Sequence, residues 1–142
     1  KKLKTKNNIK WYYNNAEKLP FRDNKFDYYT ISFGIRNVTN ISNALNEAYR
    51  VLKPGGRFLC LEFSKVRNEI LNNFYQIYSK SIPKIGKFVV GKSEPYEYFI
   101  DSIKNFYSQE ELLELLKKYN FTNTSYRNLN GGIVAIHSAW KI

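Results

Sequence analysis

One stretch of this sequence, residues 26–63, constrains the fold most strongly, because its pattern is that of a strand, a helix and a second strand. Residues 26–33 (FDYYTISF) combine aromatic side chains with Ile and Thr, which favours a β-strand. Apolar residues then recur at helical spacing over residues 41–52, and either Thr39 or Asn40 is available to cap the first helical turn.

The end of this helix and the start of the second strand are marked by the sequence Lys53-Pro54-Gly55-Gly56. A residue that precedes proline is pushed out of the helical region, and a glycine pair accommodates the positive φ of a tight turn. Residues 57–63 (RFLCLEF) follow, and their apolar middle predicts a strand that is covered on both faces. The stretch is therefore predicted to form a right-handed βαβ unit with two parallel strands.

Residues 68–107 are unusually rich in aromatic side chains. An amphipathic helical pattern that includes Phe74 and Tyr78 is interrupted at Pro83 and Gly86, and a second aromatic group follows. This composition fits a lid over an apolar ligand or a membrane-facing surface. A helical insertion that is packed internally with aromatic residues explains it equally well.

The last third of the chain predicts a helix and an antiparallel hairpin. Ser108, with Glu111 three residues later, is the signature of a capping box that opens a helix. Residues 124–129 and 133–140 are strand-like, and residues 130–132 (NGG) between them suit a tight turn. The predicted fold class is α/β, with a mostly parallel sheet that ends in an antiparallel hairpin.

Composition narrows the functional classes. At 142 residues the chain has the size of one domain, and no stretch approaches the roughly 18 apolar residues of a membrane-spanning helix. The net charge of +11 comes without any motif of a nucleic-acid reader, so no nucleic-acid partner is predicted. A single cysteine and a single histidine exclude an internal disulfide and a Cys- or His-rich metal site, and no metal is predicted. Cys60 lies in an apolar run and is predicted to be a small buried core residue.

Two segments resemble patterns that are widespread among S-adenosylmethionine-dependent methyltransferases of small molecules. Residues 15–27 (NAEKLPFRDNKFD) resemble an A-E-x-L-P-F stretch followed by D-x-x-F-D, and residues 49–56 (YRVLKPGG) resemble an R-V-L-K-P-G-G helix stop. These segments indicate the superfamily and leave its substrate open.

A narrower resemblance is carried by residues 31–38 (ISFGIRNV) and 61–65 (LEFSK), which are similar to signatures of the ubiquinone/menaquinone C-methyltransferases. Residues 82–86 (IPKIG), 96–103 (YEYFIDSI) and 131–137 (GGIVAIH) fall in the order that this family has. The resemblance covers almost the whole chain beyond residue 10.

The resemblance implies a Rossmann-like class I methyltransferase fold, with residues 1–142 as one partial domain and residues 68–107 as its lid or insertion. The family's glycine-rich G-x-G turn and acidic ribose-binding residue, which belong upstream, do not occur in this sequence, so the N-terminal strands are expected to be missing. Val66 and Tyr107 replace family prolines in loops. Taken alone, the chain is expected to be inactive, and poorly soluble or self-associating through an unpaired sheet edge.

The resemblance also implies where the cofactor, S-adenosylmethionine, would bind. Asn15 and Ala16 would flank its adenine, and Ser32 and Gly34 would line its pocket. Ligands of open α/β sheets bind at the carboxyl ends of the strands, which is where Ser32 and Gly34 are predicted to lie. For Asn15, an ordinary turn residue is the alternative interpretation.

The implied reaction is the transfer of a methyl group to a ring carbon of a polyprenyl benzoquinol or naphthoquinol. Such a carbon becomes nucleophilic when the phenol loses its proton, so Arg36 is predicted to stabilise a phenolate while Asn37 holds a water or a ring oxygen. A guanidinium keeps its proton in almost any site, so a positioned water is expected to relay the proton. The alternative for Arg36 is a surface ion pair. Glu62 and His137 are interpreted as structural side chains rather than catalytic ones.

Three functions are weighed. The leading one is C-methylation in ubiquinone or menaquinone biosynthesis; a methyltransferase of another phenol, sterol or lipid is the second, and a non-catalytic fragment or partner subunit is the third. The implied partners are a polyprenylated quinol, a peripheral membrane contact, and a homodimer or biosynthetic complex. The implied location is the matrix side of the mitochondrial inner membrane in a eukaryote and the cytoplasm in a bacterium.

Overall fold

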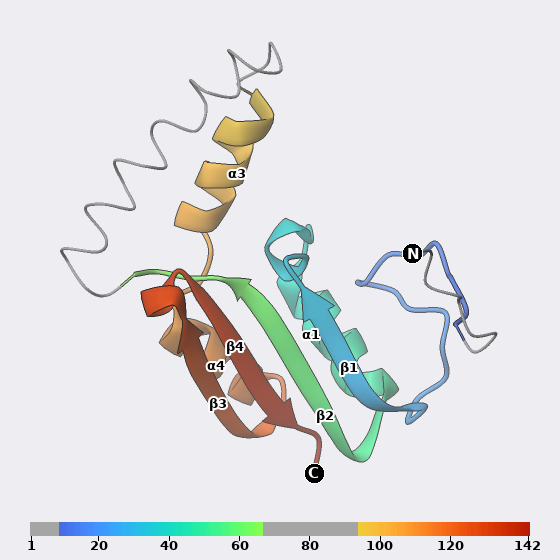
Figure 1. Cartoon of the computed structure of the whole chain (residues 1–142). Coiled ribbons are helices and arrows are strands. Elements are labelled where there is room, and N and C mark those ends of the chain that lie inside the picture. Colours follow the sequence, from blue (N-terminus) through green and yellow to red (C-terminus); the bar gives the residue numbers. More distant parts are fainter. Residues whose placement is uncertain (1–8, 67–93) are drawn as a thin grey trace, which may run out of the picture.

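A computed structural model of the chain describes residues 9–66 and 94–142, which form an open four-stranded sheet with helices (Figure 1). The predicted helix that contains Phe74 and Tyr78 lies outside the described residues, as does most of the expected lid. The described elements are, in chain order, β1 Phe26–Ser32, the 3-10 turn η1 Ile35–Asn37, α1 Ile41–Val51, β2 Leu52–Phe63, α3 Glu94–Lys104, α4 Gln109–Lys118, β3 Thr122–Leu129, the 3-10 turn η2 Asn130–Gly132 and β4 Val134–Trp140.

The predicted βαβ unit is confirmed. Strands β1 and β2 pair in parallel, with Tyr29 opposite Phe58, and α1 connects them. Of the two cap candidates, Asn40 is the residue used: its side chain accepts a hydrogen bond from the backbone N–H of Asn43 at 3.1 Å. This bond satisfies one of the backbone donors that a helix leaves open at its first turn.

The junction between α1 and β2 is tighter than expected. Strand β2 begins at Leu52 rather than at Arg57, because Leu52 already pairs with Phe26. The pairing register shifts immediately afterwards, so the predicted turn is a bend inside the strand. Gly55 has a φ of 79°, and a Cβ added at Gly56 would lie 2.7 Å from a backbone oxygen. Both glycines are therefore required by this bend.

The antiparallel hairpin at the end of the chain is also confirmed. The strand order is β1-β2-β4-β3, and β4 pairs antiparallel with both of its neighbours. The predicted tight turn at residues 130–132 is confirmed, because the three-residue 3-10 turn η2 joins β3 to β4, although β4 starts at Val134 rather than at Ile133. Asn130 and Gly131 have positive φ values of 47° and 69°, which Asn and Gly adopt more readily than other residues.

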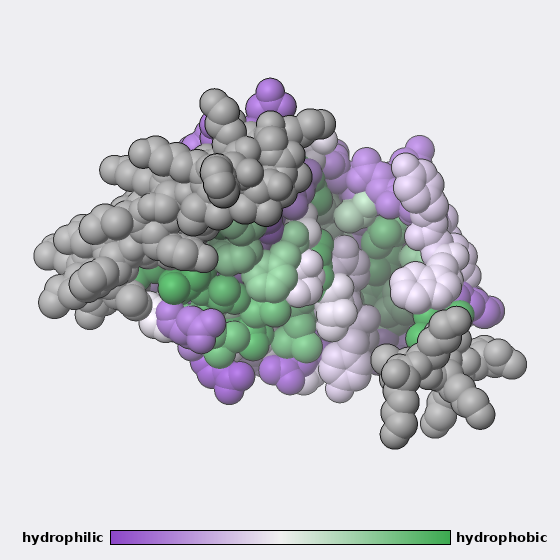
Figure 2. All heavy atoms as spheres, turned by 45° about the horizontal axis from the view of Figure 1, so that its top comes forward, coloured by the Kyte–Doolittle hydropathy of each residue, from purple (hydrophilic) through white to green (hydrophobic). Residues whose placement is uncertain are grey.

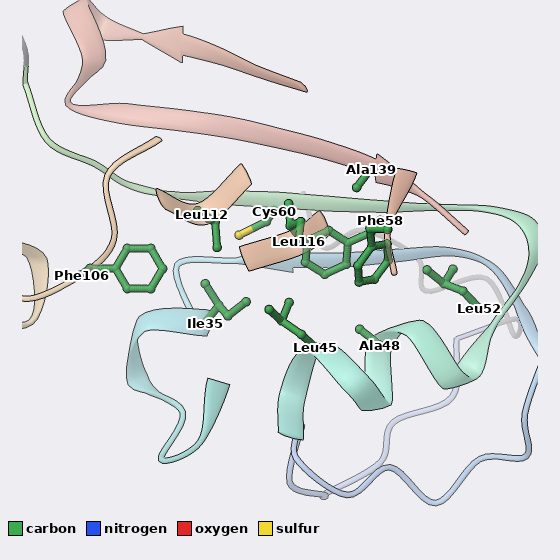
Figure 3. Close-up of a cluster of buried hydrophobic side chains, with 11 residues drawn as sticks. Ile35, Leu45, Ala48, Leu52, Phe58, Cys60, Phe106, Leu112, Leu116 and Ala139 are labelled. Carbon is green, nitrogen blue, oxygen red and sulfur yellow. The ribbon is translucent and has the colours of Figure 1, made fainter. Parts of the chain in front are cut away.

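The core lies between the sheet and two helices on one of its faces (Figure 3). Its members include Leu45 from α1, Phe58 and Cys60 from β2, and Leu112 and Leu116 from α4, all of which are almost fully buried. Burial, with a smaller contribution from a neighbouring carboxylate, raises the pKa of the Cys60 thiol to about 12. Cys60 is therefore an inert core residue, as predicted.

The opposite face of the sheet carries no described helix. Both packed helices, α1 and α4, lie behind the sheet in the view of Figure 1. Leu59, Leu61 and Ile136 on the uncovered face remain half-buried, and Figure 2 shows hydrophobic side chains at the surface between polar borders. Within the described ranges, no helix combines the length and the apolar character that crossing a bilayer requires.

Candidate active site at the carboxyl ends of two parallel strands

The carboxyl ends of β1 and β2 lie side by side, and α3 stands above them (Figure 1). Ser32, the last residue of β1, pairs with Leu61 near the end of β2. The chain then passes through Gly34 into η1, which carries Arg36 and Asn37 and contacts α3. Four of the predicted site residues are thus brought to one end of the sheet, where ligands of open α/β folds bind.

A buried ion pair joins the ends of the two strands. Arg36 Nη1 lies 2.8 Å from Glu62 Oε1, and the side chains are only 8% and 1% exposed. Glu62 Oε2 accepts a hydrogen bond from the backbone N–H of Arg36 at 3.4 Å, and Oε1 accepts one from the backbone N–H of Phe63 at 2.9 Å. Arg36 therefore forms an ion pair, but not at the surface. The contacts agree with the interpretation of Glu62 as a structural carboxylate.

The rest of the Arg36 guanidinium is held by its surroundings, with one nitrogen left over. Its Nε donates to Ser102 Oγ at 3.3 Å, and its Nη1 also donates to the carbonyl oxygen of Phe33 at 2.9 Å. The rings of Phe63 and Phe99 each lie 5.3 Å from its Cζ, within cation–π range. No described residue accepts from Nη2, so this nitrogen is available to a ligand beside the ion pair.

Phe33, between β1 and η1, has a strained backbone. Its φ of 51° is unusual for an aromatic residue, and such conformations cost of order 1–3 kcal/mol and cluster at functional sites. Its N–H donates to Leu61 O at 2.8 Å, and its carbonyl accepts from the side chains of both Arg36 and Asn37. The strain is thus held in place by the two residues predicted to be catalytic.

Asn37 links η1 to α3. The Tyr98 hydroxyl donates to Asn37 Oδ1 at 3.2 Å, while Asn37 Nδ2 donates to the Phe33 carbonyl at 3.5 Å. Both ends of the amide therefore have protein partners. The role of Asn37 in holding a water or a ring oxygen stays a prediction, to be met by the remaining lone pair and N–H of the amide.

A cavity of about 310 Å³ opens between Arg36 and α3. Sequence reasoning did not assign a role to the α3 residues that line it. Their spacing carries the signal, because residues 101 and 102 follow residue 98 at intervals of three and four and so share one face of the helix. The described residues that line the cavity are Arg36, Tyr98, Asp101, Ser102, Asn105 and Phe106.

The loop that carries Asn15 and Ala16 is tied to the same end of the sheet. Asn15 Oδ1 accepts from the backbone N–H of Glu17 at 2.9 Å, which is the geometry of an Asx turn. Glu17 Oε1 accepts in turn from the backbone N–H of Thr39, between η1 and α1, at 2.7 Å. Asn15 is therefore a turn residue whose amide nitrogen has no described partner. Its contact with adenine, like that of half-buried Ala16, stays a prediction.

Arg50 connects residues 49–56 to residues 15–27, the two segments of the sequence that resemble methyltransferase patterns, through hydrogen bonds and an ion pair. Arg50 in α1 donates to the carbonyl oxygens of Leu19 and Phe21 at 3.1 and 2.7 Å, and it pairs with Asp23 and Glu47. The hydrogen bond from Arg50 is the main cause that lowers the pKa of Glu47. Helix α1, whose last two residues open the R-V-L-K-P-G-G segment, thus anchors the loop that follows Asn15.

The remaining candidate, His137, lies in the middle of β4 and is only 2% exposed. Its Nε2 is 3.0 Å from the carbonyl oxygen of Gln109, the first residue of α4. It pairs in register with Cys60, a core residue away from the strand ends. This position supports a structural role.

The fold and the position of this site define a class of protein. The structure is similar to that of an S-adenosylmethionine-dependent methyltransferase from Thermotoga maritima, with a TM-score of 0.63 and 23% identity over 91% of this chain and 62% of that one. The fold is therefore the Rossmann-like fold of the class I methyltransferases.

The chain belongs to the ubiE/COQ5 methyltransferase family, whose model matches residues 1–141. It is 58% identical over 136 residues to the ubiquinone/menaquinone biosynthesis C-methyltransferase UbiE of Rickettsia prowazekii, which covers 95% of this chain and 55% of the relative. It is 54% identical over 135 residues to the mitochondrial 2-methoxy-6-polyprenyl-1,4-benzoquinol methylase of Bos taurus, which covers 94% and 41%. The chain thus spans about half the length of the curated relatives it matches.

Proposed function

We propose that this chain functions in an S-adenosylmethionine-dependent enzyme that methylates a ring carbon of a polyprenyl benzoquinol or naphthoquinol. The names of the Rickettsia and bovine relatives support this substrate class. The structural observation that carries the proposal is the buried Arg36–Glu62 pair, which fixes a guanidinium beside a cavity at the carboxyl ends of β1 and β2.

Two of the described residues that were predicted to bind S-adenosylmethionine have polar groups suited to that role. Ser32 is exposed at the end of β1, and the amide nitrogen of Asn15 has no described partner, so both can donate to a nucleoside. When bound, S-adenosylmethionine supplies a methyl group on a positively charged sulfur. The contribution of this chain is to hold the donor and the acceptor in line, because methyl transfer is a displacement in which positioning supplies much of the rate.

Arg36 supplies the electrostatic part of the mechanism. Its Nη2 can donate to a phenolate oxygen in the cavity, while Glu62 and the Phe33 carbonyl hold Nη1 in place. Because the guanidinium is fixed before the substrate binds, it needs no reorganisation as charge moves in the transition state. The rings of Phe63 and Phe99, which pack against each other beside the guanidinium, lower the polarity of its surroundings and strengthen the interaction.

The location and the wider partners follow the relatives. Bacterial and mitochondrial proteins are both found among them. We propose the matrix side of the mitochondrial inner membrane for this protein in a eukaryotic source and the cytoplasm in a bacterial one. Peripheral membrane contact and a homodimer or biosynthetic complex remain part of the proposal.

The test uses a hybrid protein, in which the N-terminal part of the Rickettsia prowazekii relative is joined to this chain in one polypeptide. Calorimetry should show S-adenosylmethionine binding to the hybrid protein, and mass spectrometry should show a methyl group on a ring carbon of a short-tailed polyprenyl benzoquinol. Arg36→Leu should lower kcat by roughly 10²- to 10³-fold without changing cofactor affinity. Arg127→Leu, which removes an exposed arginine from β3, is the matched control.

Two results would contradict the proposal. Cofactor binding without methylation of any quinol would favour another phenol, sterol or lipid as the acceptor. If the hybrid protein folds but does not bind S-adenosylmethionine, this chain does not contribute to a cofactor site, and a non-catalytic partner subunit becomes the favoured function.

A further inference from the structure

We propose that Asp101 of α3 accepts the proton of the substrate phenol in the cavity beside Arg36. The inference rests on the proposed function and adds the group that makes the acceptor carbon nucleophilic. Arg36 lines this cavity together with Tyr98, Asp101 and Ser102 of α3 and two residues that follow the helix.

The α3 wall of this cavity is fixed to the catalytic end of the sheet at several points. Ser102 accepts from Arg36 Nε, Tyr98 donates to Asn37, and the ring of Phe99 packs edge-on against Phe63 with centroids 5.2 Å apart. Asp101 lies on the same helix between these contacts. Its carboxylate is therefore presented to the same space as the free nitrogen of Arg36.

The other polar groups around the cavity are unsuited to take a proton. Arg36 keeps its own proton and is a donor only. Both carboxylate oxygens of Glu62 already accept hydrogen bonds, and the Ser102 hydroxyl donates to Phe99 O at 2.7 Å. Among the described residues that line the cavity, Asp101 is the only carboxylate, and no described side chain or N–H donates to it.

The cavity has room for the ring of a quinol. A cavity of about 150 Å³ can hold benzene, whereas this one measures about 310 Å³. Phe106, which is 7% exposed, gives it an apolar part, and the polar groups of Arg36 and Asp101 can bind the phenolic edge.

The proposed step conserves protons and electrons. The phenol O–H proton passes to the Asp101 carboxylate, and the electron pair of the ring carbon forms the bond to the methyl carbon while the methyl–sulfur pair stays on sulfur. The resulting dienone loses its ring proton to water, and its oxygen regains the proton from Asp101. One proton is released for each methyl group transferred, and Asp101 returns to its carboxylate form.

The experiment measures quinol methylation by the hybrid protein and three variants. Asp101→Asn keeps the size of the side chain and removes the base, so kcat should fall by about 10²-fold or more, as is typical when a general base is lost. Asp101→Glu should retain most of the rate. Glu97→Gln, which removes an exposed carboxylate from the same helix outside the cavity, should leave the rate unchanged.

A second measurement separates a base from a structural residue. Added formate should restore part of the rate of Asp101→Ala, because a small carboxylate can occupy the space that the side chain leaves, and it should not accelerate the unchanged hybrid protein. Wild-type turnover in Asp101→Asn, or a loss in Asp101→Ala that formate does not restore, would overturn the assignment while leaving the proposed function intact. Failure of the unchanged hybrid protein to methylate any quinol would instead contradict the proposed function.

Discussion

At the scale of single residues, His137 is buried with only one of its two ring nitrogens hydrogen-bonded to a described residue. His137 Nε2 contacts the Gln109 carbonyl, so the imidazole donates there, and its Nδ1 is buried with no partner among the described residues. Charging the ring would place a second N–H where no described residue accepts a hydrogen bond from it. Burial accordingly lowers the pKa of His137 below its usual value.

This arrangement predicts a loss of stability in mild acid. Because the pKa is lower in the folded chain than in the unfolded one, the contribution of His137 is fully present above the unfolded pKa and is lost as pH falls through the folded pKa. Urea unfolding of the chain at a series of pH values should show the free energy of unfolding declining below roughly pH 6.5. His137 is the only histidine, so His137→Gln should remove this decline. An unchanged decline in the variant would contradict the prediction.

Residue identity alone could predict where Arg36 and Glu62 lie, but not that they meet. Sequence placed one residue after the first strand and the other near the end of the second. Their 2.8 Å contact depends on the register between β1 and β2, and that register shifts once near the start of the pairing. A shift of one residue would turn Glu62 to the other face of the sheet. No local pattern encodes the shift, so the partner of Arg36 could not be read from the sequence.

At the scale of elements, α4 depends on its cap. Ser108 accepts from the backbone N–H of Glu111, and Glu111 Oε2 accepts from the backbone N–H of Ser108 at 2.7 Å, which completes the predicted capping box. The helix presents Leu112 and Leu116 to the core, so fraying of its first turn would loosen the core as well.

Ser108→Ala should lower the free energy of unfolding by about 1 kcal/mol, within the 0.5–2 kcal/mol range of lost N-caps. Ser125→Ala, at an exposed position of β3 whose side chain makes no described hydrogen bond, is the control and should change little. Chemical denaturation followed by circular dichroism measures both. Equal effects in the two variants would show that the capping box contributes nothing to stability.

Element types were more predictable than element ends. The capping box and the βαβ unit have local signatures, and both are confirmed. The starts of β2 at Leu52 and of β4 at Val134 depend on contacts with distant strands, because Leu52 pairs with Phe26 and Ser64 N–H donates to Ile133 O at 2.9 Å. Long-range pairing of this kind overrides local turn propensity.

At the scale of the whole molecule, the described sheet has two edges of different character. β3 carries mostly polar side chains, including Arg127, whereas β1 is rich in aromatic residues and exposes 64% of Tyr28. Among the described residues, β1 pairs only with β2, so the backbone groups on its other side are available for pairing. Next to it lies the sheet face that no described helix covers. Exposed strands with apolar side chains pair readily with other chains unless a charge interrupts them.

The chain on its own should therefore associate through β1. Sedimentation velocity should show assemblies that grow with concentration, and hydrogen exchange should show protected β1 amides within them. Tyr28→Lys should shift the distribution toward the monomer, because a charge on an edge strand opposes pairing.

Ser125→Lys places the same charge on β3 and should have little effect. The hybrid protein, in which the relative's N-terminal part joins the chain, should associate less. A chain that sediments as a monomer throughout, or equal effects of the two lysines, would contradict association through β1.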